Sequence, residues 1–217
     1  MKVDKLNIDN IEKLLQFEPS EKILVRAIKG LKVERKDLYQ RWIIRIVSLF
    51  LGLMVGMNYN TVRIYQDSVE AITNILLAFF GIIFTGYSLL QAFMNKNMLM
   101  QLLIDEKKES DKETKSRLQD INENFTYLMI VILIHIIGSL IIRTIITCIS
   151  DDFCALSNIM MNNFCAVLLI SIYYDFTGII LWRIVSFLTS VHHLFNIYAV
   201  TRLTEIIEED SKTGMQK

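Results

Sequence analysis

Four long apolar runs stand out in the pattern of hydrophobic and polar positions along the chain. They cover residues 42–59, 71–94, 126–149 and 164–188. A helix needs about 20 predominantly apolar residues to cross the ~30 Å hydrocarbon core of a bilayer, and core helices of soluble proteins rarely stay apolar for so long. The pattern therefore predicts an all-α integral membrane protein in which four transmembrane helices form a bundle.

Basic residues are distributed unequally between the segments that flank these runs. Segments 1–41, 95–125 and 189–217 contain ten, six and three Lys or Arg residues, whereas the two remaining connectors contain only Arg63. Lys and Arg accumulate on the cytoplasmic side of a membrane. Both termini and the middle segment are therefore expected to be cytoplasmic.

Residues 1–41 predict a cytoplasmic region of short amphipathic helices, separated at the only proline, Pro19. After this proline, Ser20 can cap a helix, and apolar residues recur at helical spacing from Ile23 to Leu31. The basic residues of the opposite face and of the segment that follows are Lys22, Arg26, Lys29, Lys32, Arg35 and Lys36. We expect them to bind either anionic lipid head groups or an anionic ligand at the mouth of a channel.

The other two cytoplasmic segments are expected to be helical as well. Residues 95–125 predict a helical hairpin with a charged turn around residues 107–115, and the segment mixes six basic with seven acidic residues. Residues 189–217 predict a helix that prolongs the fourth run, followed by a tail.

One face of the second run is kept free of bulky side chains. At alternating spacings of three and four residues it carries what we call the small-residue stripe: Ala71, Asn74, Ala78, Gly81, Thr85, Ser88 and Ala92. This heptad spacing is the packing geometry of most membrane bundles. We expect the stripe either to pack against the first run or a neighbouring subunit, or to line a water-filled pore.

Small residues also recur in the first run, where Ser48, Gly52 and Gly56 lie four residues apart. Helices in lipid associate through close backbone approach at such positions. The motif predicts tight packing of the first transmembrane helix without naming its partner.

Three ionisable residues lie deep in the third and fourth runs, namely His135, Arg143 and Asp175. An Asp at the bilayer centre costs about 2.5–3.5 kcal/mol on insertion scales, so Asp175 should face protein or water and have a partner. His135 and Arg143 both lie roughly 6 Å from it in depth at a rise of about 1.5 Å per residue. We favour an Asp175–Arg143 ion pair, because Arg stays charged and can donate two hydrogen bonds to a carboxylate. Such a pair would serve either the structure or conduction and gating.

Sequence motifs of catalysis are missing, since GxSxG, HExxH, Walker A and GxGxxG do not occur. One His and one Asp at mid-membrane are too little for a nucleophile–base pair or a metal cluster. We therefore expect no enzyme, no metal site and no cofactor, and no long nucleic acid as a partner.

A compact four-span chain with both ends inside, a basic helical N-terminal region and a small-residue stripe resembles membrane effectors of bacterial anti-phage systems. The chain resembles Hailong-type effectors as a first choice and the membrane component of Kiwa as a second. The Hailong resemblance covers the whole chain. It implies a tetrameric ion channel in the bacterial inner membrane, held closed by short nucleotide oligomers that a partner nucleotidyltransferase makes. These oligomers would bind at an electropositive cytoplasmic surface containing Lys22, Arg26, Lys29, Lys32, Arg35 and Lys36.

The sequence thus predicts a homo-oligomeric ion channel or pore-forming effector that is gated from the cytoplasmic side and depolarises the membrane when it opens. A protein of a different class fits the same features. This would be a non-conducting membrane sensor or scaffold that recruits a cytoplasmic partner through its cytoplasmic helices.

Overall fold

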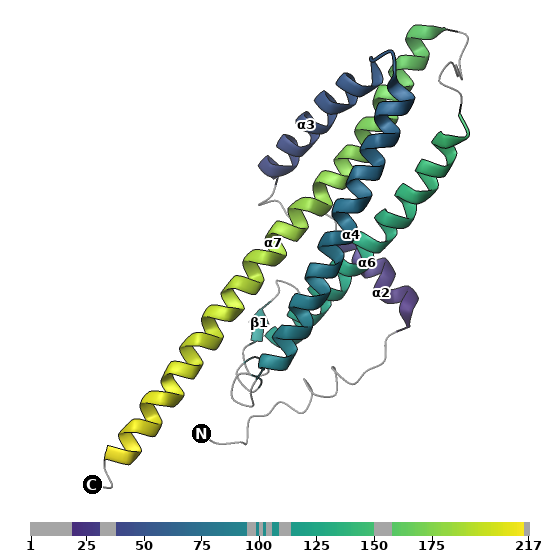
Figure 1. The fold of residues 1–217 in the computed structure, drawn as a ribbon. Coiled ribbons are helices and arrows are strands. Elements are labelled where there is room, and N and C mark those ends of the chain that lie inside the picture. Colours follow the sequence, from purple (N-terminus) through teal and green to yellow (C-terminus); the bar gives the residue numbers. More distant parts are fainter. Residues whose placement is uncertain are drawn as a thin grey trace. The chain divides into compact units, whose positions relative to one another are not determined.

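A computed structural model describes residues 19–30, 38–94, 99, 102, 106–108, 114–149 and 158–214. The helices in this part of the chain are α2 (Ser20–Gly30), α3 (Leu38–Gly56), α4 (Thr61–Phe93), α6 (Arg117–Thr147) and α7 (Ile159–Gly214) (Figure 1). Two short strands, β1 (Glu106–Lys108) and β2 (Thr114–Ser116), are also described. The predicted all-α class is confirmed.

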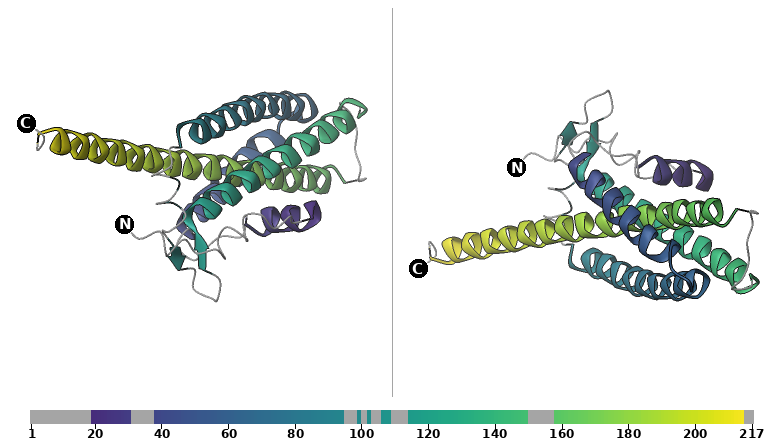
Figure 2. Two further views of the ribbon diagram at one scale, coloured as in Figure 1. Left: turned by 90° about the horizontal axis from the view of Figure 1, so that it is seen from below. Right: turned by 90° about the horizontal axis from the view of Figure 1, so that it is seen from above.

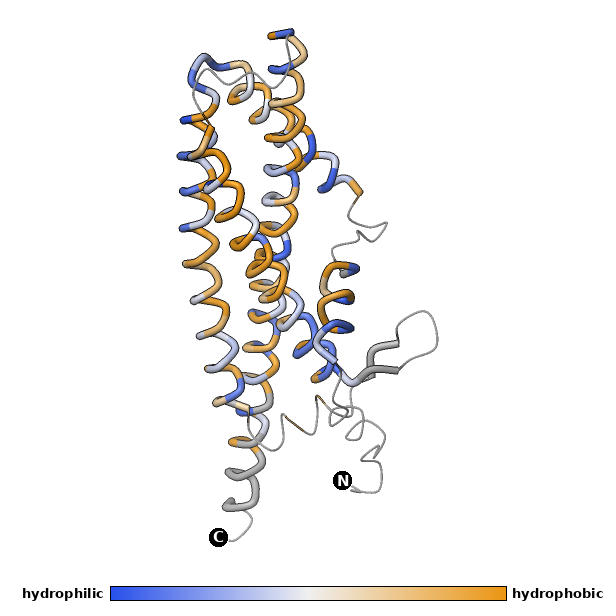
Figure 3. The backbone as a smooth tube through the Cα atoms, turned by 90° about the vertical axis from the view of Figure 1, so that its right-hand side faces the viewer, coloured by the Kyte–Doolittle hydropathy of each residue, from blue (hydrophilic) through white to orange (hydrophobic). Residues whose placement is uncertain are grey.

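Four of the described helices, α3, α4, α6 and α7, are long and apolar enough to cross a membrane. Apolar residues run along each of them (Figure 3), and many large apolar side chains are exposed, among them Ile46, Phe50 and Ile172. Exposing these apolar side chains to water would be unfavourable, whereas the hydrocarbon of a membrane solvates them. The chain is therefore a multi-pass membrane protein.

The longest helix, α7, runs without a break over 56 residues (Figures 1 and 2). At 1.5 Å per residue it is about 84 Å long, far more than the ~30 Å that a membrane span requires. Its C-terminal part is the predicted helical extension of the fourth run.

The strands add one detail to the sequence analysis. β1 and β2 pair antiparallel with Glu106 opposite Ser116 and Lys108 opposite Thr114, so a short strand pair lies where a charged turn was predicted around residues 107–115 of the hairpin 95–125. A polar segment without an apolar face has nothing to bury as a helix, and Ser and Thr are weak helix formers. The return of the chain is therefore made by a strand pair before α6 begins.

Side-chain caps fix where the helices begin. The Ser116 hydroxyl accepts a hydrogen bond from the backbone N–H of Gln119 (3.3 Å), and the Asn158 side chain accepts one from Met160 (2.9 Å). These contacts satisfy N–H groups that lack a partner in the first helical turn. Between α3 and α4, the Thr61 hydroxyl donates to the carbonyl of Asn58 (2.6 Å) and closes a tight turn.

The described residues belong to two compact units. Unit 1 contains the part of α4 from Thr85, α6 as far as Thr126 and α7 from Val185. Unit 2 contains α3, α4 as far as Phe84, α6 from Tyr127 and α7 as far as Ile184, together with most of α2.

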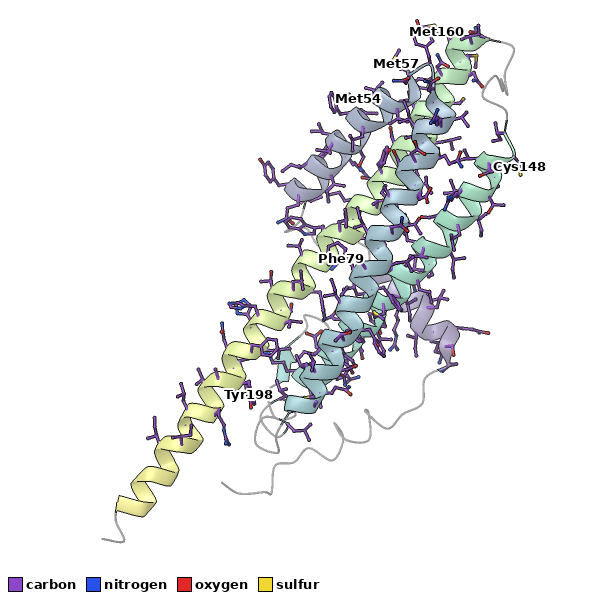
Figure 4. All side chains as sticks on the ribbon, viewed as in Figure 1. Met54, Met57, Phe79, Cys148, Met160 and Tyr198 are labelled. Atoms are coloured by element: carbon purple, nitrogen blue, oxygen red, sulfur yellow. The ribbon has the colours of Figure 1, made fainter. Side chains whose placement is uncertain are left out.

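Unit 1 has a small apolar core of its own. Leu90, Leu102, Leu118 and Leu194 are buried together, and Tyr198, which Figure 4 labels, packs against them. Beside this cluster, the rings of Tyr87 and Phe125 stack at a centroid distance of 3.7 Å, and the Tyr87 hydroxyl donates to the Asn122 side chain (2.8 Å). The core of unit 2 contains two of the polar residues singled out in the transmembrane runs, Ser48 and His135.

Candidate functional site

Helices α6 and α7 are joined in unit 2 by two buried polar contacts. His135 Nε2 lies 2.9 Å from Thr177 Oγ1, and Ser139 Oγ lies 3.0 Å from the Tyr173 hydroxyl. A step of four residues along α6 is thus matched by a step of four residues back along α7, as antiparallel helices require. All four side chains are almost completely buried, so each contact is made where water cannot replace it.

The hydrogen-bond partners define the tautomer of His135. The Thr177 hydroxyl donates its single hydrogen to the carbonyl of Tyr173 at 2.9 Å, so it can only accept from His135. The proton of the neutral imidazole is therefore on Nε2. The ring also stacks on Tyr173 at a centroid distance of 5.2 Å. His135 therefore links α6 to α7 through its hydrogen bond to Thr177 and does not pair with Asp175.

Arg143 pairs with Glu70, not with Asp175. Arg143 Nη2 lies 2.8 Å from Glu70 Oε2, with both side chains two-fifths exposed. Nearby, the Gln66 side chain donates to the Thr147 hydroxyl (3.4 Å), which adds a second polar contact between α4 and α6.

The predicted Asp175–Arg143 pair is wrong because depth alone does not make residues neighbours. Tyr173 and Thr177 face α6, and Asp175 lies two residues from each of them. Two residues turn an α-helix by about 200°, so Asp175 points away from α6 and from Arg143.

The opposite face of α7 packs closely against α3. A Cβ atom placed on Gly52 would overlap Ser171 Oγ, and one on Gly56 would lie 2.6 Å from Val167 Cγ2 and 2.9 Å from the Val167 nitrogen. On α7, a Cβ at Gly178 would lie 2.7 Å from Ile44 Cγ2. These distances leave no room for a methyl group. The small residues of α3 therefore pack against α7, which is the partner that the sequence motif left open.

Figure 4 shows the same antiparallel arrangement at one end of unit 2. Met57, just after α3, and Met160, in the first turn of α7, lie at the same end (Figure 4). Both side chains are exposed.

The close packing of α3 and α7 fixes the level at which Asp175 lies. Starting from Gly52 opposite Ser171, one turn back along α3 reaches Ser48 and one turn forward along α7 reaches Asp175, so the two residues share a level. Ser48 is buried, and Asp175 Oδ1 is buried without a hydrogen-bond partner among the described residues. An unsatisfied carboxyl oxygen in a bilayer interior is costly and is typical of functional residues.

The small-residue stripe lies on the surface of the chain. All seven of its residues are exposed, whereas the buried positions of α4 are Val69, Thr73, Leu76, Ile83 and Leu90. A Cβ atom on Gly81 would meet nothing within 4 Å. The expectation that the stripe packs against the first run is therefore wrong. A neighbouring subunit and water stay as its predicted partners.

The basic N-terminal residues are described only in part. Lys22, Arg26 and Lys29 are exposed on α2. Lys32, Arg35 and Lys36 lie outside the described residues, so their expected role in ligand binding stays a prediction.

Sequence reasoning missed Glu70, Tyr173 and Thr177. Tyr173 and Thr177 are four residues apart, the same spacing as His135 and Ser139, and that match was a usable signal. Glu70 was assigned to a connector, yet it lies more than two turns inside α4, which begins at Thr61, because α4 begins well before the apolar run does.

Comparison with known proteins gives no relative. No family model, no curated protein and no solved structure matches this chain.

Proposed function

We propose that this membrane protein is a homo-oligomeric ion channel whose pore is lined or bordered by α4. The observation that carries the proposal is the exposure of the whole small-residue stripe. Asn74, Thr85 and Ser88 gain nothing from lipid contact, and a helix that faced only lipid would not need seven small positions in register. A second copy, or water held between copies, fits this surface.

The proposal extends to regulation and biological role. Both termini face the cytoplasm, and the regulatory signal reaches the channel through the cytoplasmic helices. The resemblance to Hailong-type effectors supports a tetramer in the bacterial inner membrane that depolarises the cell during phage infection. In this scheme the regulating ligand is a short nucleotide oligomer.

Membrane potential in cells tests the proposal directly. The protein is expressed in bacteria that carry a voltage-sensitive dye, with the neighbouring genes supplying any trigger. Wild type should depolarise the cells. Gly81→Phe should abolish depolarisation, because the bulky ring fills the stripe, while the protein still inserts into the membrane.

A control on the same helix makes the result specific. Ile82 is exposed but lies outside the stripe, so Ile82→Phe should leave depolarisation intact. A wild-type protein that never depolarises triggered cells would refute the channel and favour the non-conducting sensor or scaffold. Full activity of Gly81→Phe would remove the stripe from the pore.

A further inference from the structure

Helix α2 presents three different surfaces around its axis. Ala27 is only 2% exposed, and Ile23, one turn away, is half-buried, so this side is covered. Leu24 and Ile28, also one turn apart, are 42% and 49% exposed on the next side. Lys22 and Lys29, two turns apart, are exposed on a third side.

The exposed apolar side of α2 needs an explanation. The helix has only 11 residues, so packing of its few apolar side chains must supply much of its stability. Burying a Leu or Ile side chain is favourable, because it removes apolar surface from water. Yet α2 leaves Leu24 and Ile28 uncovered while Ala27 is packed. Val25, at the edge toward the basic side, is also exposed.

A bilayer is within reach of these side chains. Helix α2 ends at Gly30, and the transmembrane helix α3 begins at Leu38. Even fully extended, the connection reaches roughly 28 Å at about 3.5 Å per residue. The helix is therefore tied close to a membrane surface, where an apolar side flanked by lysines is the pattern of interfacial helices.

We propose that α2 is an anionic-lipid-binding helix that lies in the head-group region. Leu24, Val25 and Ile28 insert at the boundary of the acyl chains, and Lys22 and Lys29 lie at the lipid phosphates. Anionic lipid is favoured over a soluble polyanion because it meets both surfaces at once. A soluble polyanion would pair with the lysines and leave Leu24 and Ile28 in water.

Spin labels on the full-length protein in nanodiscs test this placement without any measurement of current. The three native cysteines are first replaced by serine, since Cys148 and Cys165 are exposed and would be labelled. A label is then attached at Ile28→Cys and, as the matched control on the same helix, at Lys29→Cys. Accessibility to oxygen reports lipid, and accessibility to a water-soluble nickel complex reports water.

In nanodiscs that contain phosphatidylglycerol, the Ile28 label should be accessible to oxygen and shielded from nickel. The Lys29 label should show the reverse preference. An Ile28 label accessible to nickel would place this side in water and overturn the proposal. A label shielded from both reagents would place it against protein and overturn the proposal as well.

The lipid head group and a soluble anion are separated by two further arms. The double variant Lys22→Glu/Lys29→Glu, or phosphatidylcholine alone, should move the Ile28 label toward water. An unchanged label position in both would refute the electrostatic part. Inorganic triphosphate should not move the Ile28 label, which leaves both lysines in place, toward water in anionic nanodiscs. If it does, the lysines belong to a soluble polyanion. A failed current assay leaves these results unaffected, so this inference and the channel proposal fail separately.

Discussion

At the scale of single residues, Asp175 is notable in the membrane-embedded part, because its buried Oδ1 has no hydrogen-bond partner among the residues that the structure describes. It lies at the level of the buried Ser48, next to the positions where α3 and α7 pack closely. Such an arrangement costs stability, and proteins retain costly groups where function uses them. Asp175 is thus the residue at which stability and gating should trade against each other.

Replacing Asp175 by Asn should therefore stabilise the protein and alter its gating. The amide keeps the shape of the side chain and removes the charge. A neutral amide costs less to bury in a bilayer interior than a carboxylate does, so thermal unfolding in detergent should shift upward. Asp67→Asn, at an exposed position of α4, should leave it unchanged. A lower unfolding temperature would mean that Asp175 has a stabilising partner, and unchanged currents would make it dispensable to the channel.

Arg143 shows what sequence could and could not predict at this scale. Its position near the end of the third run was evident, and so was its need for an acidic partner. The choice between Asp175 and Glu70 depended on the direction in which each side chain leaves its helix. Apolar runs without a polar face define depth but leave rotation about the axis undetermined, and the partner was misassigned for that reason.

At the scale of helices, run length and composition predicted more. Four spans followed from hydrophobic length because the bilayer sets a fixed requirement. The strands β1 and β2 did not, because six polar residues hold no periodic signal. The α3–α7 packing was predictable in part. The spacing of Gly52 and Gly56 predicted a close helix contact, but only the structure shows that Ser171 and Val167 lie opposite them.

This packing predicts a contrast between glycines. Gly52→Ala and Gly56→Ala place a methyl group where α7 leaves no space, and overpacking of this kind typically costs 1–3 kcal/mol, so we expect a loss of about that size. Gly81→Ala is the matched control, because its methyl group meets nothing within the chain. Thermal unfolding of the three purified variants in detergent measures the difference. Equal unfolding temperatures would show that α3 does not pack on α7 as closely as described.

At the scale of the whole molecule, the open issue is what covers the stripe of α4. Within one chain, α3 and α6 pack against α7, and the small-residue stripe of α4 takes no part in these contacts. In an assembly of identical copies, the same face offers each copy a close contact or a shared aqueous path. Three environments are then distinguishable by experiment, namely a neighbouring subunit, water and lipid.

Cysteine chemistry at Ala78 separates these environments. In a background without native cysteines, we expect Ala78→Cys to form disulfide-linked dimers under mild oxidation, because a heptad seam brings equivalent positions of neighbouring helices together. Modification by a membrane-impermeant, water-soluble thiol reagent without dimer formation would place the stripe in an aqueous pore. Leu77→Cys is the control, since Leu77 is exposed but lies beside the stripe, and it should do neither. If Ala78→Cys behaves like this control, the stripe faces lipid and the assembly through α4 is wrong.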